Sequence, residues 1–480
     1  MSLLRPIDRT RGSRSSPLVP LPLLLLLALA ALAGPDALTG AATLAALDAA
    51  AVATPGQPLP LEEAVRLARL HNPMVLESRA NRGAASAARS EVAASRWPTL
   101  AIRETAVRTD GPADVFGMRL QQERFSFPAF VSSDPNQPDV ADGFATELEV
   151  RAPVFTGGRI RSGIRQAGRM VEAATRIEEH TTRSVDLAVA GAYLDALLAD
   201  SALALATRAR DTTSRHVARA QDLYDAGMMV ESDLLQARAQ LAQMEEGVIR
   251  ARNQSVLART ALAAAIGVDP ATVDSLLVPS TPPIERPATL ESAIQTALSR
   301  RADLRAMQAR VDAAGAGIAQ AQGEYFPSIG VAGRFSLHDV HSFGSHGRSF
   351  ALVAQAEWSL WNGGATAARV RRSRQERSAA EEARRAQETK AEIEVRQAWN
   401  AIEEAEAREK AAADAVAASS RALAILEDRF EQGVAPMTDL LDAEMTLHEA
   451  RVRNLQARFD RQRSIRTLSF AMGASPVPEA

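Results

Sequence analysis

Residues 224–238 read YDAGMMVESDLLQAR, and residues 430–444 read FEQGVAPMTDLLDAE. Each stretch has a glycine, five further residues and then Asp-Leu-Leu-x-Ala, and the two glycines lie 206 positions apart. Each glycine stands between long alanine-rich segments, where a helix can end and the chain can reverse. The same element made twice in one chain predicts an internal duplication.

The duplication covers both halves of the chain. LEEAVRLARLHNP begins at Leu61 and matches LESAIQTALSRRA, which begins at Leu290, at an offset of 229. Further on, FTGG at 155–158 matches WNGG at 361–364, where the offset has become 206. The first half therefore carries 23 extra residues, which fall in one enlarged loop of a tandem repeat.

The matched positions define the predicted parts of the chain. Each repeat should contain helices, a β-hairpin, a long helix, a tip turn and a returning helix. The ranges are 59–279 for the first repeat with its hairpin at about 99–154, 280–287 for a linker, 288–475 for the second repeat with its hairpin at about 328–360, and 476–480 for a tail. The predicted junctions are Pro98 and Pro327 from helix to strand, and Gly157, Gly158, Gly363 and Gly364 from strand to helix.

Proline placement indicates very long helices, because a helix interior excludes proline. None occurs from Val154 to Asp269 or from Ser328 to Ala435. The segment Arg159–Asp225 alone would form a helix roughly 100 Å long, which no globular core spans. After each tip glycine, apolar residues recur at heptad spacing with alanine on one seam, as in a close-packed coiled coil. The seams are Leu234, Leu241, Val248, Ser255 and Leu262; Ala237, Met244, Ala251, Ala258 and Ala265; and Ala443, Ala450, Ala457, Ser464 and Ala471.

Between the aromatic-Pro and Gly-Gly steps the apolar period changes from seven to two. Apolar residues alternate with small or polar ones in four segments, of which Thr99–Arg108 alternates least clearly. Such segments of about ten residues suit membrane-spanning β-strands, although soluble hairpins packed on the helices would show the same pattern. In lipid, four strands cannot close a barrel and open edges are prohibitive, so three chains would have to supply twelve strands.

The N-terminus predicts a cleaved secretory signal at 1–33. Several arginines precede the apolar run Leu23–Ala33, which ends in a small-residue cleavage site. A membrane anchor is the alternative, but this run of 11 residues is short of the roughly 20 that span a bilayer. Residues 34–58, rich in Ala, Thr, Gly and Pro, are predicted to form a flexible lead-in.

Composition and motifs exclude several classes of protein. The 480 residues carry a net charge of −3, so no basic field points to nucleic acid. Without cysteine, disulfides, thiolate metal sites and cysteine nucleophiles are excluded. The sequence has no P-loop, no HExxH motif and no nucleophile–base arrangement. We therefore expect neither an enzyme nor a bound cofactor.

Together these features resemble the TolC family of outer membrane efflux channels over about 59–475. The resemblance rests on the paired halves, the aromatic-Pro steps, FTGGR and WNGG, and the Gly-x5-Asp tips. It implies a mainly α fold with a membrane portion: a homotrimer whose four strands per chain form a twelve-stranded β-barrel, continued by a long antiparallel coiled-coil α-barrel. The implied location is the outer membrane of a Gram-negative-type envelope, extending into the periplasm.

The same resemblance implies a function and partners. The chain would be the passive exit channel of a tripartite efflux or secretion system. The implied partners are a periplasmic adaptor (membrane fusion protein), an inner-membrane transporter of RND or ABC type, and outer membrane lipid. A periplasmic coiled-coil scaffold or adaptor without a pore is the alternative, although such a protein would not need amphipathic strands. The transported substrate is selected by the transporter, so this sequence does not name it.

The resemblance places Gly227 and Gly433 at periplasmic tip turns that dock the adaptor. Family carboxylates matching Asp439 and Asp442 line the periplasmic entrance, so threefold symmetry would stack two acidic rings that favour cations. Asp233 is the first-half counterpart of Asp439. The alternative interpretation of Asp439 is a helix N-cap or first-turn acid, which the helix dipole favours.

The tips depart from the family pattern at four positions. Gln236 replaces the second acid in the first half. Family members can hold the tip shut through a tyrosine and an arginine beside the turn, where this chain has Phe430 and Ala435, followed by an added Pro436. The resemblance therefore carries over the acidic rings but not the closing bonds.

Three histidines lie between the two predicted strands of the second half, at His338, His341 and His346. An H-x2-H-x4-H cluster can bind a metal ion, here at the extracellular mouth. Solvated loop histidines are the simpler interpretation, so no metal site is predicted.

Overall fold

The computed structural model describes residues 58–132, 134–279 and 286–477, which belong to one compact unit. The predicted signal peptide, nearly all of the predicted lead-in and most of the predicted linker lie outside the described residues.

The first half begins with two helices and ends with a long helical hairpin. Its elements are α3 (Leu61–His71), α4 (Pro73–Ala94), β1 (Thr99–Thr109), α5 (Pro112–Gln121), α6 (Phe127–Ser132), β2 (Ala141–Phe155), α7 (Arg159–Asp225), α8 (Glu231–Ile266) and the 3-10 helix η2 (Pro270–Thr272).

The second half repeats this order without the helices between its strands. Its elements are α9 (Leu290–Arg300), α10 (Ala302–Gln322), the 3-10 helix η3 (Gly323–Tyr325), β3 (Ser328–Asp339), β4 (Gly347–Glu357), α11 (Ala365–Glu431) and α12 (Met437–Ala471). The mainly α fold, the four strands and the internal duplication are confirmed.

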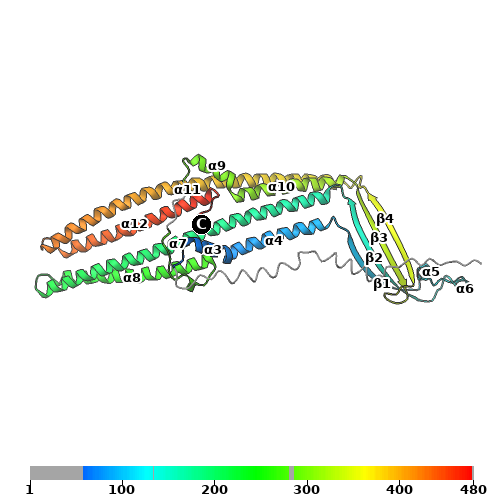
Figure 1. The fold of residues 1–480 in the computed structure, drawn as a ribbon, viewed down its shortest axis with the longest axis horizontal. Helices are drawn as coiled ribbons and strands as arrows, with labels where there is room; N and C mark the ends of the chain where they lie inside the picture. Colours follow the sequence, from blue (N-terminus) through cyan, green and yellow to red (C-terminus); the bar gives the residue numbers. More distant parts are fainter. Residues whose placement is uncertain (1–57, 133, 280–285, 478–480) are drawn as a thin grey trace, which may run out of the picture. The chain divides into compact units, whose positions relative to one another are not determined.

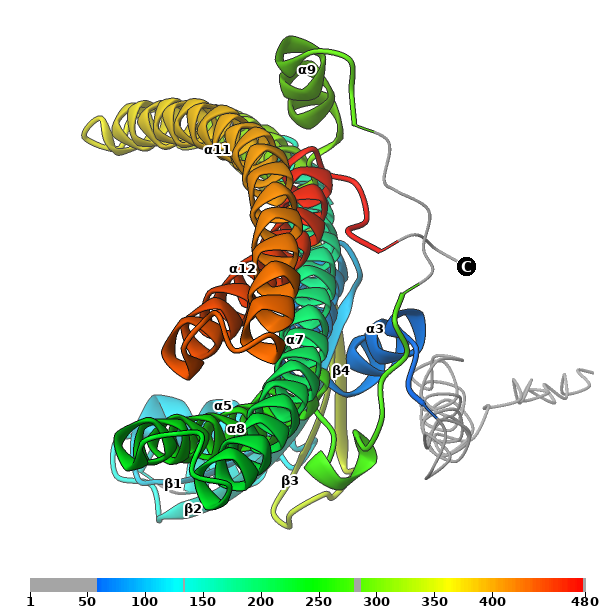
Figure 2. The same cartoon turned by 90° about the vertical axis from the view of Figure 1, so that its left-hand side faces the viewer.

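Two antiparallel helical hairpins, α7–α8 and α11–α12, dominate the described unit. Figure 1 shows them side by side with their turns at the same end, and Figure 2 shows them as one curved layer. Both α7 and α11 have 67 residues, and each begins after a glycine in the left-handed conformation, Gly158 and Gly364. In α8 the predicted heptad residues are the ones that pack: Leu234, Ala258 and Leu262 are buried.

One window of α7 is apolar enough to span a membrane, with a mean hydropathy of 1.5. However, 39% of that window is buried inside the protein. The helix packs its apolar residues, among them Val189 and Tyr193, against neighbouring helices. We therefore interpret this stretch as a packing segment of the helical layer.

The four strands form one antiparallel sheet in the order β1-β2-β3-β4. The two predicted hairpins are therefore joined through β2 and β3. The register places Ile102 opposite Leu148, Leu148 opposite Phe335, and Phe335 opposite Phe350, which makes an apolar row across all four strands. Ile102 is 66% exposed and Phe350 is 85% exposed. This face does not pack on the helices, which contradicts the soluble-hairpin alternative and suits a lipid-facing surface.

The opposite face of the sheet is polar, and α5 covers part of it. By the strand register, a side chain at Gly143 or Gly347 would lie on the same face of the sheet as Glu147. A Cβ at Gly143 would collide with Met118 of α5, and one at Gly347 would collide with Gln121 of α5. The buried side chain of Gln122 donates hydrogen bonds to backbone carbonyls at the ends of β2 and β3, 3.4 and 3.0 Å away. The extra residues of the first half thus form a folded insertion across the polar face.

The Gly-Gly junctions permit a matched test of the strand-to-helix turn. Gly157 and Gly363 both have positive φ, 63° and 68°, but a Cβ at Gly157 would collide with the carbonyl oxygen of Gly323, whereas Gly363 faces open space. We expect Gly157→Ala to destabilise the protein by about 1–3 kcal/mol through overpacking in addition to backbone strain. Gly363→Ala should add only the strain of roughly 1–2 kcal/mol. Thermal unfolding of the two purified variants measures the difference, and equal shifts would show that the close approach is unimportant.

Candidate functional site

The candidate site is the end of the two hairpins, where both turns lie together (Figure 1). Gly227 and Gly433 have φ of 72° and 73°, the left-handed conformation that a glycine adopts without cost. A small apolar cluster joins the hairpins just behind the turns. Its buried members are Ala220, Leu234, Ala237, Met437, Leu440 and Leu441.

The two aspartates of α12 lie on the side of the helix that this cluster leaves free. Leu440 and Leu441 are buried in the cluster, whereas Asp439 and Asp442 are exposed. Pro436 is the N-cap residue of α12, so Asp439 is a first-turn acid and not the cap. Within the described ranges neither carboxylate has a hydrogen-bond or ion-pair partner. Their charges are therefore available to the solvent at the positive end of the helix dipole.

Asp233 occupies the corresponding place in the first turn of α8. It is half-buried, and the hydroxyl of Ser232 lies 3.3 Å from its carboxylate. The first-half acid is thus less exposed than its second-half counterpart.

A contact between the hairpins was missed by the sequence analysis. The guanidinium of Arg219, on α7, lies 6.0 Å from the ring centroid of Phe430 and donates a hydrogen bond to Glu431 at 3.2 Å. It joins the two hairpins beside the turn, where the family's tyrosine and arginine are replaced. Position 425, its repeat counterpart, is an isoleucine, so the comparison of the halves gave no signal for it.

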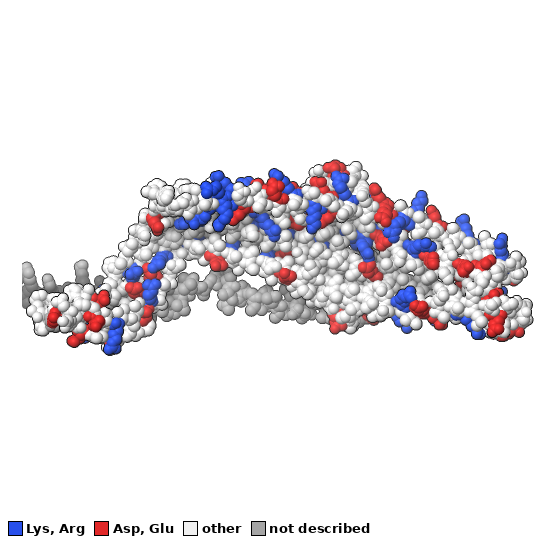
Figure 3. All heavy atoms as spheres, turned by 180° about the vertical axis from the view of Figure 1, so that it is seen from behind, with Lys and Arg blue, Asp and Glu red and all other residues white. Residues whose placement is uncertain are grey.

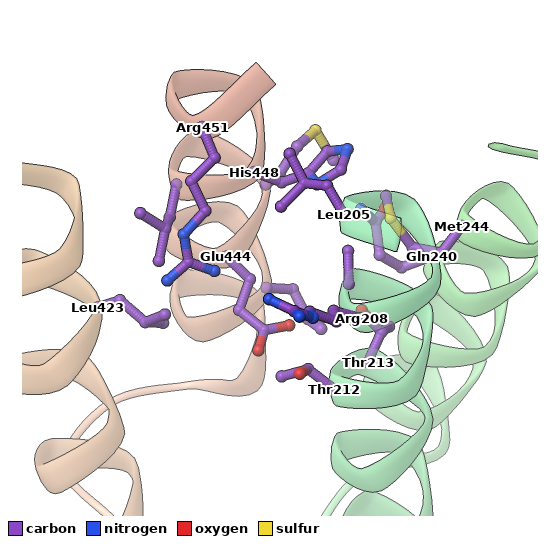
Figure 4. A pocket seen from close by; sticks show the side chains of 14 residues that line it. Leu205, Arg208, Thr212, Thr213, Gln240, Met244, Leu423, Glu444, His448 and Arg451 are labelled. Carbon is purple, nitrogen blue, oxygen red and sulfur yellow. The ribbon is translucent and has the colours of Figure 1, made fainter. Parts of the chain in front are cut away.

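A small pocket of about 80 Å³ lies between the hairpins, further from the turns (Figure 4). Glu444 on α12 and Arg208 on α7 point into it from opposite sides, and Arg451 lies beside Glu444. Nε2 of His216 is 2.7 Å from Oε1 of Glu444. None of these residues was singled out by the sequence pattern.

The polar face of the sheet carries charges of both signs. Arg334 lies 3.5 Å from Glu149, which also pairs with Arg151 at 2.9 Å, and Arg103 lies 3.7 Å from Glu147. Figure 3 shows acidic and basic side chains side by side over the sheet end and along the helices. Such a mixed surface suits the wall of a water-filled lumen.

The helices contain a strongly buried charged network around Arg301. Arg301 is only 3% exposed. Its guanidinium donates two hydrogen bonds to Asp303, at 3.1 and 2.8 Å, and one to Glu394, at 2.6 Å. Burial alone would raise the pKa of Asp303, but Arg301 and the amide of Gln387 outweigh it and lower that pKa from 3.8 to about 2. Burial lowers the pKa of nearby His180.

The remaining predicted positions lie as follows. Pro98 and Pro327 directly precede β1 and β3, and the two Gly-Gly steps directly precede α7 and α11. His341 and His346 each lie beside Asp339, at 3.6 and 3.4 Å, and are largely exposed. His338 does not lie between the strands as predicted, because β3 extends to Asp339 and His338 pairs with Gly347 of β4. Among the residues that the structure describes, none of the three histidines belongs to a group of metal-ligating side chains.

Comparison with known proteins agrees with this architecture. The family model described as outer membrane efflux protein matches residues 64–268 and 293–474. The outer membrane efflux protein BepC of Brucella suis is 22% identical over 316 residues, which cover 65% of this chain and 68% of BepC.

Several solved structures share the fold. A membrane protein of Pseudomonas aeruginosa matches with a TM-score of 0.73 and 22% identity over 86% of this chain and 90% of its own. The CmeC outer membrane channel of Campylobacter jejuni matches with a TM-score of 0.74 and 16% identity over 87% of each chain. These likenesses show the fold, in which the strands of three chains close a twelve-stranded β-barrel and the helices form an α-barrel.

The family model covers both repeats, and its members are trimeric channel proteins rather than enzymes. The pore-free scaffold is therefore not favoured. The chain belongs to the outer membrane efflux protein family: it is a channel of the outer membrane, extending into the periplasm, that gives effluxed substrates an exit in concert with a periplasmic adaptor and an inner-membrane transporter.

Proposed function

We propose that Asp439 and Asp442 form two stacked carboxylate rings at the periplasmic entrance of the trimer and that these rings favour the passage of cations. The observation that carries the proposal is their placement: both are exposed and unpartnered among the described residues, on the side of α12 opposite the apolar tip cluster. Asp233 contributes a further acid from the first half.

The proposed selectivity is electrostatic. Three protomers would bring six carboxylates to a narrow, water-filled bore, where fixed charge of one sign concentrates counter-ions and repels ions of like charge. Substrates delivered by the transporter pass through this field without any energy-consuming step in the channel itself.

The turns at Gly227 and Gly433 are the proposed docking surface for the adaptor. Apolar side chains stand exposed beside them: Met228 is 71% exposed, Val230 62% and Val434 72%. Apolar residues grouped at an exposed tip are typical of an interaction surface. In this proposal the adaptor is a membrane fusion protein and the transporter is of RND or ABC type.

Single cysteines test the rings directly, because the chain has no cysteine of its own. In Asp439→Cys or Asp442→Cys, three thiols would face one another across the bore and bind Cd²⁺ as thiolates. We expect micromolar Cd²⁺ to block single-channel current in planar bilayers and EDTA to restore it. Glu449→Cys, about two turns further along the same helix, is the control and should stay open. Insensitivity of both ring variants would place these aspartates outside the entrance.

A further inference from the structure

Three side chains from three different helices converge between the hairpins. They are His216 on α7, Glu427 on α11 and Glu444 on α12, and one donor atom from each lies within 4.8 Å of the other two. The side chains of His216 and Glu444 are 17% and 11% exposed. Glu427 closes the group from the solvent side.

The internal repeat shows that this arrangement is unusual for its position. Glu427 and Glu444 correspond, at the offset of 206, to Gln221 and Arg238 in the first half. There the pair is complementary, because Arg238 donates a hydrogen bond of 2.6 Å to the Gln221 amide oxygen. In the second half, two carboxylates face each other across the same helix pair.

No arginine or lysine within the described ranges forms an ion pair with Glu427 or Glu444. Arg208 and Arg451 line the adjacent pocket and reduce the negative potential there, but neither bridges the two carboxylates. One nitrogen of His216 lies within 4.8 Å of both carboxylates, and this histidine has no counterpart in the second half, where position 422 is alanine. Two facing carboxylates at a half-buried site favour a cation between them.

We propose that His216, Glu427 and Glu444 bind one divalent transition-metal ion per protomer, of which Zn²⁺ is the best fit. One imidazole and two carboxylates form a ligand set that Zn²⁺ accepts, with water in the fourth position. Tetrahedral Zn²⁺ with bonds of about 2.0–2.2 Å needs donors roughly 3.3 Å apart. Here the His216 and Glu444 donors are 2.7 Å apart, and no two donors of the group are more than 4.8 Å apart. Side-chain rotations are therefore sufficient to bring the three donors to the spacing that Zn²⁺ needs.

The bound ion would join α7 of the first hairpin to both helices of the second. His216 and Glu444 each lie eleven residues from their tip glycine, about 17 Å along the helix. Separation of the two hairpins at this level would require the loss of at least one metal–ligand bond. Zinc in the periplasm would therefore stabilise the packed arrangement of the tip.

Calorimetric titration of Zn²⁺ into the detergent-solubilised trimer tests the proposal. The background should carry Asp439→Asn and Asp442→Asn, so that the proposed rings cannot bind the ion and failure of one proposal does not affect the other. We expect three sites per trimer, and His216→Gln or Glu427→Gln should weaken binding at least about tenfold. The control is Asp414→Asn, an exposed acid between three and four turns away on α11, which should leave the affinity unchanged.

Cu²⁺ as a paramagnetic probe identifies the nitrogen ligand. The wild-type spectrum should show hyperfine coupling to one imidazole nitrogen, and His216→Gln should remove it. Coupling that instead disappears in a His341→Gln/His346→Gln variant would assign binding to the loop histidines and overturn the proposal. Absence of calorimetric binding would also overturn it.

Discussion

Replacing Asp439 and Asp442 together with alanine is expected to abolish the cation preference of the channel and its block by multivalent cations, while trimers still assemble. Both side chains are exposed, so truncation opens no cavity in the tip cluster and should change stability by less than about 0.5 kcal/mol. The loss of six charges around one bore removes the field that concentrates cations there. Fields of this kind change local ion concentration by roughly tenfold or more.

The measurement is the reversal potential of single channels in a salt gradient, together with the concentration of a trivalent cation that halves the current. The double variant should have a reversal potential near zero and need at least about ten times more blocking ion. Glu449→Ala removes an exposed acid from the same helix and should leave both values unchanged. Retained selectivity, or failure of the double variant to assemble, would assign the two aspartates a structural role.

The long helices and tip turns could be predicted because their signals are local. The Gly-Gly step after β2 and the tip glycine Gly227, with no proline between them, delimit Arg159–Asp225, and the structure has α7 with the same bounds. Heptad spacing identified the buried side of α8 for the same reason, since it depends only on residues a few positions apart. Strand alternation is also local, and even the weak pattern at Thr99–Arg108 became β1.

Features that depend on distant contacts could not be predicted residue by residue. The sequence predicts the insertion between β1 and β2 only as an enlarged loop, yet it contains α5, α6 and three packed phenylalanines. The ring centroids of Phe116, Phe125 and Phe130 lie 5.3–5.7 Å apart. The pairing of β2 with β3, far apart in sequence, was likewise visible only in the structure.

The candidate site divides in the same way. Asp439 and Asp442 were found because the repeated motif carries them. Arg219 and the group of His216, Glu427 and Glu444 combine helices of both hairpins, and the equivalent positions in the opposite half differ in chemistry. A comparison of the two halves finds what the duplication preserved, whereas these contacts arose where the halves diverged.

Divergence of the halves also explains the buried network around Arg301. In the first half the corresponding residue is Asn72, whose amide donates to the carbonyl of Ala265 at 2.7 Å. Arg301 reaches the equivalent carbonyl, that of Ala471, at 3.2 Å. Both side chains thus tie the end of a returning helix to the chain between two short helices. The arginine does so at the cost of a buried charge, which Asp303 must neutralise.

Arg301→Ala is expected to destabilise the protein by about 3–5 kcal/mol, because it leaves buried Asp303 without its cation. Thermal unfolding of the trimer at fixed protein concentration measures this loss. Arg305→Ala removes an exposed arginine one turn away that bonds a single backbone carbonyl, so it should change stability by less than about 0.5 kcal/mol. If the two variants unfold alike, the network does not stabilise this region.

Dependence on pH distinguishes the ion pair from simple loss of packing. The pKa of Asp303 in the folded protein, about 2, lies below its ordinary 3.8, so the folded state favours the charged carboxylate. The resulting stabilisation of about 2 kcal/mol is fully present above roughly pH 4 and is lost as the pH falls towards 2. The Asp303→Asn variant should therefore be less stable than the wild type above this interval and should approach the stability of the wild type as the pH falls through it. The stability difference between the Arg301→Ala variant and the wild type should also become smaller over the same range. A deficit that stays constant from pH 6 to pH 2 would show that these side chains act through packing alone.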